Sequence, residues 1–165
     1  MRTASRAMLA LVLALAGPSM STAQATAHPS LAGSWVLDPA QSDQGQQMMP
    51  TKLNLTITQS AKELVVMRAQ TTQMGESNAT LKYALDGTTS VNEIPMGGNA
   101  VKISTVVSWE GETTVFKNTL DIQGNEVQQM DKWTLADGGK KLLVVRNINF
   151  GGQETTFKLT LVKQP

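Results

Sequence analysis

Residues 101–161 read VKISTVVSWEGETTVFKNTLDIQGNEVQQMDKWTLADGGKKLLVVRNINFGGQETTFKLTL, and this stretch decides the fold. Apolar and polar side chains alternate along it with a period of two residues, which is the pattern of half-buried β-strands. Four glycine-containing pairs interrupt the alternation, and each is a candidate two-residue hairpin loop: Glu110-Gly111, Gly124-Asn125, Gly138-Gly139 and Gly151-Gly152. The stretch therefore predicts five successive antiparallel strands.

Pairing the residues outward from these loops predicts the register of the five strands. Three of the resulting rows share one face: Thr105, Phe116, Trp133, Val144 and Leu159; Ile103, Asn118, Asp131, Arg146 and Phe157; and Val101, Leu120, Gln129, Ile148 and Thr155. Independent loop assignments thus place the large apolar residues on the same side of the sheet. A slip of one residue at any loop would turn a whole strand over and destroy this agreement.

The alternation continues toward the N-terminus, with Leu53 and Leu55 in one strand and Leu81 and Tyr83 in another, the latter followed by a further predicted two-residue loop, Asp86-Gly87. Three polar segments interrupt it and are predicted as loops at the rim of a barrel: 38–51, 71–78 and 94–99. The whole pattern predicts an all-β fold, an antiparallel up-and-down meander of about 8–10 strands that closes into a barrel.

The N-terminal residues have the layout of a secretory signal peptide. Arg2 and Arg6 precede an apolar run, 7–16, and small residues follow at Ala23-Gln24-Ala25. The run is shorter than the ~20 residues of a membrane-spanning helix. We therefore predict a signal peptide at 1–25, a short linker at 26–30 and one barrel domain at 31–165, exported to the periplasm or the medium and not spanning a membrane.

Composition and motifs narrow the function. Without the signal peptide the chain has 12 basic and 13 acidic residues, which offers no electrostatic case for nucleic acid. There is no cysteine, so the core must stabilise the exported domain without disulfides. The one histidine, His28, lies in the predicted linker. No motif for nucleophilic, metal or phosphate chemistry occurs, so we predict no catalytic residue, no metal and no cofactor.

Gly33-Ser34-Trp35 resembles the G-x-W signature of lipocalins and related calycins, in which the tryptophan closes one end of the barrel. Residues 133–142 are similar to a stretch of small exported bacterial lipocalin-like proteins, apart from one additional glycine. This resemblance implies a barrel with an apolar ligand inside. In lipocalins a basic residue of the last strand packs over that tryptophan. Here the inward basic residue is Arg146, on the penultimate strand, and Lys158 points outward in the predicted register, so the contact is in question.

Asp131 and Arg146 face each other on the predicted interior. A buried charge requires a partner, so we expect an ion pair, with Asn118 completing its hydrogen bonds. One interpretation is a polar anchor in which Arg146 grips the carboxylate of a ligand. The other is a structural pair that only fixes the interior.

The sequence favours an exported binding protein that holds a small hydrophobic or amphipathic ligand inside the barrel. The predicted ligand-binding residues are Arg146, Asp131, Asn118, Tyr83, Phe116, Trp133, Phe157, Ile103 and Leu120. Four methionines lie in or beside the predicted rim loops: Met48, Met49, Met74 and Met96. One alternative is a structural or interaction protein whose barrel is filled by its own side chains. Another is an enzyme, which would need a base with a pKa near neutrality, and an aspartate beside an arginine is not one.

Overall fold

The structure is a computed structural model that describes residues 28–43, 49–73, 75–96, 98–122 and 124–165. These residues form ten strands: β1 (Gly33–Leu37), β2 (Lys52–Gln59), β3 (Glu63–Thr72), β4 (Gly75–Ala84), β5 (Ser90–Met96), β6 (Asn99–Glu110), β7 (Thr113–Ile122), β8 (Asn125–Ala136), β9 (Lys141–Phe150) and β10 (Gln153–Lys163). They also form two short 3₁₀ helices: η1 (Pro39–Gln41) and η2 (Asp137–Gly139). The predicted signal peptide lies outside the described residues, so the domain boundaries stay predictions.

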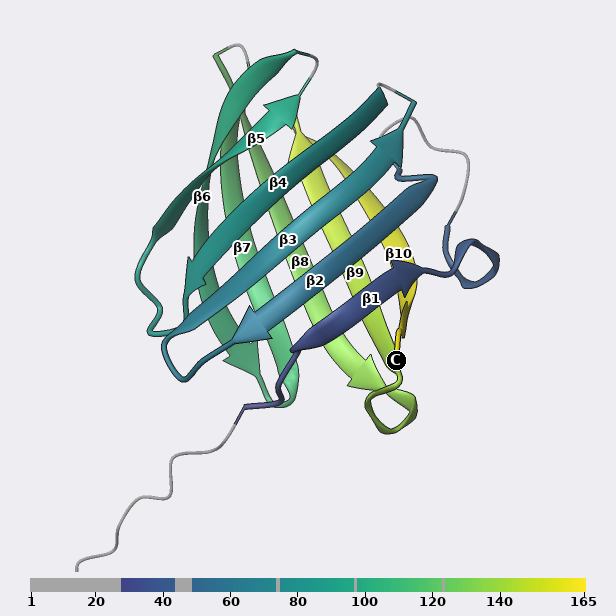
Figure 1. Ribbon diagram of the computed structural model, residues 1–165. Coiled ribbons are helices and arrows are strands. Elements are labelled where there is room, and N and C mark those ends of the chain that lie inside the picture. Colours follow the sequence, from purple (N-terminus) through teal and green to yellow (C-terminus); the bar gives the residue numbers. More distant parts are fainter. Residues whose placement is uncertain (1–27, 44–48, 74, 97, 123) are drawn as a thin grey trace, which may run out of the picture.

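The ten strands make one antiparallel sheet in the order β4-β3-β2-β1-β10-β9-β8-β7-β6-β5. Strands that follow each other in the chain are hydrogen-bonded neighbours, except for β4 and β5, and β1 joins the first half to the second by pairing with β10. In Figure 1 the strands β1–β4 cross in front of β7–β9, so the sheet wraps around an interior. The predicted all-β meander is confirmed as a nearly closed barrel.

The sheet has no backbone ladder between β4 and β5, its two edge strands. Side chains of β5 bridge this seam instead. The amide of Lys82 donates to Asn92 Oδ1 at 2.8 Å, Asn92 Nδ2 donates to the Lys82 carbonyl at 2.9 Å, and the amide of Ala84 donates to Ser90 Oγ at 2.8 Å. A carboxamide offers one acceptor and two donors, so Asn92 supplies the hydrogen bonds that a neighbouring backbone would provide.

The predicted register is confirmed in the last two strand pairs. Asp131 lies opposite Arg146, and Arg146 lies opposite Phe157. The Gly151-Gly152 loop has the predicted two residues, because Phe150 pairs with Gln153. The loop at 137–140 is longer than predicted, since the last pair is Ala136 with Lys141, but the register it sets is the predicted one. Trp133 and Arg146 therefore share the interior face.

The predicted register is wrong by two residues in the pairs β6–β7 and β7–β8. Thr105 lies opposite Asn118 rather than Phe116, and Phe116 lies opposite Asp131 rather than Trp133. The turns sit one residue away from the predicted positions, because Glu110 pairs with Thr113 and, at the next turn, 122 pairs with 125. Each shift is an even number of residues, so every side chain keeps its predicted face while its neighbours change.

Three loop predictions need correction. The segments 71–78 and 94–99 are mostly strand, because β3 reaches Thr72, β4 starts at Gly75 and β5 reaches Met96. Asp86-Gly87 lies inside a five-residue connection, 85–89, rather than forming a two-residue loop. Successive polar side chains in these segments point alternately to the solvent-exposed outer face and to a partly polar interior. The alternation of apolar and polar residues therefore does not identify these strands. The segment 38–51 does connect β1 to β2, although 44–48 lie outside the described residues.

One end of the barrel is closed around Trp35, which is fully buried. Its Nε1 donates to the carbonyl of Leu31 at 2.9 Å, and the Nζ of Lys163 lies 5.3 Å from its ring centroid. The basic residue over this tryptophan is thus Lys163 on β10, rather than Arg146 or Lys158. Gly33 has a φ of 140°, which other residues rarely adopt, and a Cβ there would also lie 2.7 Å from Lys163 Cε and displace the end of that side chain.

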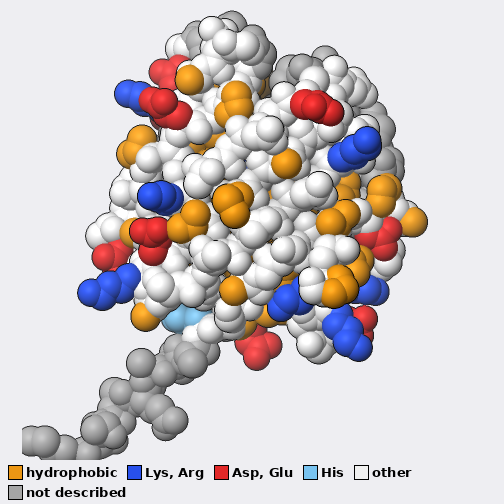
Figure 2. Space-filling model, viewed as in Figure 1, with side chains coloured by type: hydrophobic (Ala, Val, Ile, Leu, Met, Phe, Trp, Pro, Cys, Tyr) orange, Lys and Arg blue, Asp and Glu red, His pale blue; other side chains and the backbone are white. Residues whose placement is uncertain are grey.

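A second aromatic contact lies at the same end. The ring of His28 stacks on Trp109 with centroids 3.9 Å apart and planes 9° apart. We call this the closed end, and the opposite end, where β3 turns into β4 and β5 into β6, the open end. In Figure 2 the face in view carries interspersed basic and acidic side chains.

Candidate functional site

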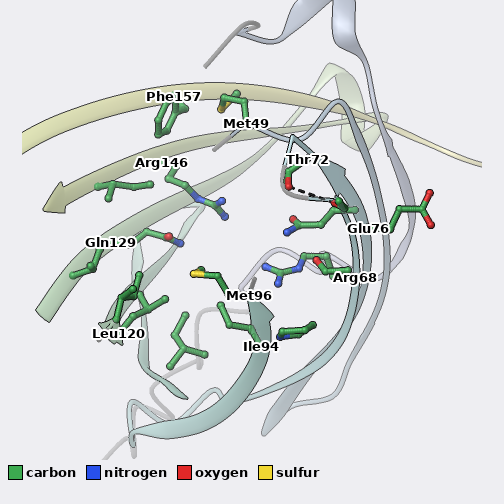
Figure 3. A pocket seen from close by; sticks show the side chains of 18 of the residues that line it. Met49, Arg68, Thr72, Glu76, Ile94, Met96, Leu120, Gln129, Arg146 and Phe157 are labelled. Carbon is green, nitrogen blue, oxygen red and sulfur yellow. Dashed lines mark hydrogen bonds between the residues drawn. The ribbon is translucent and has the colours of Figure 1, made fainter. Parts of the chain in front are cut away.

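Two adjoining cavities occupy the interior. The upper cavity, about 180 Å³, lies toward the open end, where its wall includes Thr72, Gly75 and Met96 (Figure 3). The deep cavity, about 50 Å³, lies among larger side chains nearer the closed end. Seven residues line both cavities: Arg68, Gln70, Ile94, Ile103, Gln129, Arg146 and Leu159. The barrel is thus hollow toward one end and nearly filled toward the other.

The structure brings all nine predicted ligand-binding residues to the walls of these cavities. Four line the upper cavity: Ile103, Leu120, Arg146 and Phe157. Seven line the deep cavity: Tyr83, Ile103, Phe116, Asn118, Asp131, Trp133 and Arg146. Of the rim methionines, Met49 and Met96 line the upper cavity, whereas 48 and 74 lie outside the described residues.

Asp131 and Arg146 form a buried bidentate pair. Arg146 Nε donates to Asp131 Oδ1 at 2.8 Å and Nη2 donates to Oδ2 at 2.7 Å. The Asp131 side chain is 6% exposed and that of Arg146 is 23% exposed. Burial lowers the pKa of Arg146, but the charge of Asp131 and the hydrogen bonds to it outweigh burial, and its pKa is raised. The guanidinium therefore stays charged, and its Nε and Nη2 edge is hydrogen-bonded to Asp131.

The prediction that Asn118 completes this pair is wrong. Gln129 does so, since its Nε2 lies 3.2 Å from both oxygens of Asp131. Asn118 accepts a hydrogen bond from Thr105 Oγ1 at 2.7 Å instead. The cause is the two-residue register shift, which moves Asn118 from opposite Asp131 to opposite Gln129.

The deep cavity is small because three aromatic rings pack beside it. Tyr83 meets Phe116 edge-on at 5.1 Å between centroids, and Phe116 meets Trp133 at 4.8 Å. Burial raises the pKa of Tyr83 above its ordinary value, and the carboxylate of Asp131 raises it further. The hydroxyl therefore stays protonated at physiological pH and can donate a hydrogen bond.

Sequence reasoning missed Arg68, which lines both cavities from β3. In the part of the chain that the structure describes, no group accepts a hydrogen bond from its Nε, which is buried. Burial lowers the pKa of Arg68, and the positive charge of Arg146 lowers it further. The alternation of β3 could have revealed it, because Arg68 has the same parity as the buried Leu64 and Val66.

The described residues contain no cluster of three or more His, Cys, Asp or Glu side chains that could hold a metal ion. Among the same residues, no helix has the length and apolar character needed to cross a bilayer. Glu76 borders the upper cavity, but its carboxylate points away from the interior (Figure 3). The chemistry of the site is therefore that of two arginines, one paired aspartate, amides and an apolar wall.

No protein-family model matches this sequence. No curated protein matches it at a significant level either. Solved structures do match its fold. A mutant of the fluorescent protein UnaG superposes with a TM-score of 0.53 and 18% identity, covering 81% of this chain and 96% of that one. The fold is a calycin-like β-barrel.

The zebrafish ileal bile acid-binding protein, in complex with cholic acid, is a second match to this calycin-like barrel. It superposes with a TM-score of 0.51 and 19% identity, covering 82% of this chain and all of the other, 100%. At this identity the likeness concerns the fold alone.

Proposed function

We propose that this chain is an exported binding protein that holds a small hydrophobic or amphipathic molecule in the upper cavity. The observation that carries the proposal is the cavity itself, about 180 Å³ beside Arg146, whose lining combines apolar and polar side chains. Such a lining suits an amphipathic molecule, because apolar side chains can cover its hydrocarbon part and polar groups can fix its orientation. The side chains of a narrow barrel can fill its interior completely, whereas here they leave a cavity toward the open end.

The similar structures support this proposal by analogy, since the zebrafish protein was solved in complex with cholic acid. Export is supported by the signal-peptide layout of residues 1–25. A catalytic role has less support. The buried carboxylate Asp131 is hydrogen-bonded to Arg146 and Gln129, so it is a poor candidate for a general base.

The proposal is tested by titration with N-phenyl-1-naphthylamine, a neutral probe whose fluorescence rises in apolar surroundings. Ile148 lines the upper cavity, so Ile148→Phe fills part of it, whereas Leu143 on the same strand points outward and is 38% exposed. We expect the wild type and Leu143→Phe to bind the probe alike and Ile148→Phe to bind it at least about tenfold more weakly, the effect of roughly 1.4 kcal/mol.

A structural barrel without a ligand is the second candidate, and the filled deep half favours it. It predicts that no variant binds the probe. It also predicts that native mass spectrometry of the protein, purified from its own host without denaturation, finds no companion molecule. Both results together would replace the binding proposal with the structural one.

A further inference from the structure

The charges that face the interior do not balance. Two guanidinium groups, those of Arg68 and Arg146, line both cavities, and one carboxylate, that of Asp131, lines the deep cavity. Glu76 is exposed and directs its carboxylate away (Figure 3). Among the described charges that are directed into the interior, one positive charge is therefore uncompensated. A buried charge without a partner is costly, so an unbalanced site of this kind favours an anion.

The uncompensated charge belongs to Arg68. Asp131 occupies the Nε and Nη2 edge of Arg146 in a bidentate pair. Arg68 has no ion pair and no hydrogen-bond acceptor among the described residues, and its Nε is buried. In Figure 3 the guanidinium groups of Arg68 and Arg146 both extend into the cavity from opposite walls. An anion held between them would receive hydrogen bonds from Arg68 and from the free end of Arg146.

A second buried donor without an acceptor belongs to a residue that lines the same cavity. Trp133 Nε1 is buried without an acceptor among the described residues, and Trp133 lines the deep cavity together with Arg68. Tyr83, whose hydroxyl stays protonated, also lines it. Three donors from different strands thus surround a space of about 50 Å³, which is suited to a small acceptor group rather than to a hydrocarbon chain.

We propose that the ligand is an amphipathic anion whose carboxylate binds Arg68 at the deep cavity while its apolar tail lies in the upper cavity toward the open end. This inference rests on the proposed binding function and specifies its ligand class. The planar guanidinium binds a carboxylate through two parallel hydrogen bonds, which selects for that head group. The tail has a wall of Ile94, Leu120 and Ile148. The anchor is therefore Arg68 rather than the paired Arg146.

The test compares two ligands of equal chain length, decanoate and decanol, at pH 8 in low salt. Each displaces N-phenyl-1-naphthylamine from the wild type, from Arg68→Gln and from Lys117→Gln. Lys117 is exposed on the outer face, so its variant removes a charge without touching the interior. We expect the wild type and Lys117→Gln to prefer decanoate by at least about tenfold, as a charged hydrogen bond predicts. Arg68→Gln loses this preference and binds decanol as before.

The outcomes separate the two proposals. Equal affinity of the wild type for decanoate and decanol overturns the anionic ligand and leaves the binding function standing. A preference for decanoate that survives in Arg68→Gln overturns the assignment to Arg68. Failure of the neutral probe and of both ligands to bind any variant overturns the binding function, and the inference falls with it. Far-ultraviolet circular dichroism of each variant checks that the barrel is folded.

Discussion

The two halves of the barrel interior differ in how completely side chains fill them. Toward the closed end, Trp35 donates to a backbone carbonyl and lies under Lys163, and aromatic rings fill the space beside Tyr83. Toward the open end lies a cavity of about 180 Å³, and Arg68 beside it has no acceptor for its Nε among the described residues. The closed half is therefore the better packed one, and the open half contains the space and the unpaired charge on which the proposed binding function rests.

The largest expected effect is the loss of an aromatic ring from the filled half. Phe116 is buried and contacts both Tyr83 and Trp133, so Phe116→Ala should destabilise the fold by about 3–5 kcal/mol. Ile148 is half-buried beside the existing cavity, so Ile148→Ala should lower the free energy of unfolding by only about 1–2 kcal/mol. Urea denaturation of both variants measures the difference. Equal losses would show that the two halves are packed alike and remove the basis of the comparison.

The next effect concerns the ion pair at the junction of the halves. Asp131→Asn leaves two inward arginines without a carboxylate, and removing one partner of a buried pair costs about 3–5 kcal/mol. The exposed pair of Lys132 and Glu110, with side chains 37% and 57% exposed, is the control, because Glu110→Gln should change stability by less than ~1 kcal/mol. Similar midpoints of urea denaturation for both variants would contradict the burial of the Asp131 charge.

The sequence predicts which side chains face the interior better than it predicts which of them are cross-strand partners. Asp131 and Arg146 were placed opposite each other because the loops on both sides of β9 set the register that the structure has. Asn118 was misplaced because a glycine does not say which of the two loop positions it occupies. The predicted face of each side chain is nevertheless correct. Side chains alternate with a period of two, so a shift of two residues exchanges cross-strand partners without turning the strand over.

Two basic residues were missed, and the reasons differ. Lys163 has the same parity as Leu159 and Leu161 on β10, so alternation could have placed it on the interior face, and the closure of β1 against β10 brings it to Trp35. Arg68 was missed because the strands before residue 85 were not placed in register. Alternation could not show that Arg68 lacks a partner. Which groups surround its side chain depends on the curvature that brings β3 across the barrel from β9.

The smallest predicted effect appears only at high pH and involves the single tyrosine of the chain, Tyr83. Its folded pKa is raised by burial and by Asp131 above an unfolded value of 10.0, so the folded state keeps its proton where the unfolded state loses it. The stabilisation is fully present below pH 10 and is lost as the pH rises toward the folded pKa, by about 1.4 kcal/mol per unit. Lysines also titrate in this range, so the measured quantity is the difference in the free energy of unfolding between the wild type and Tyr83→Phe.

Absorbance near 295 nm offers a direct readout of Tyr83 ionisation, because one phenol produces the whole signal. If Tyr83 ionises in the folded protein with a midpoint near pH 10, then water reaches its hydroxyl. The filled half of the interior would in that case be as accessible to solvent as the open half.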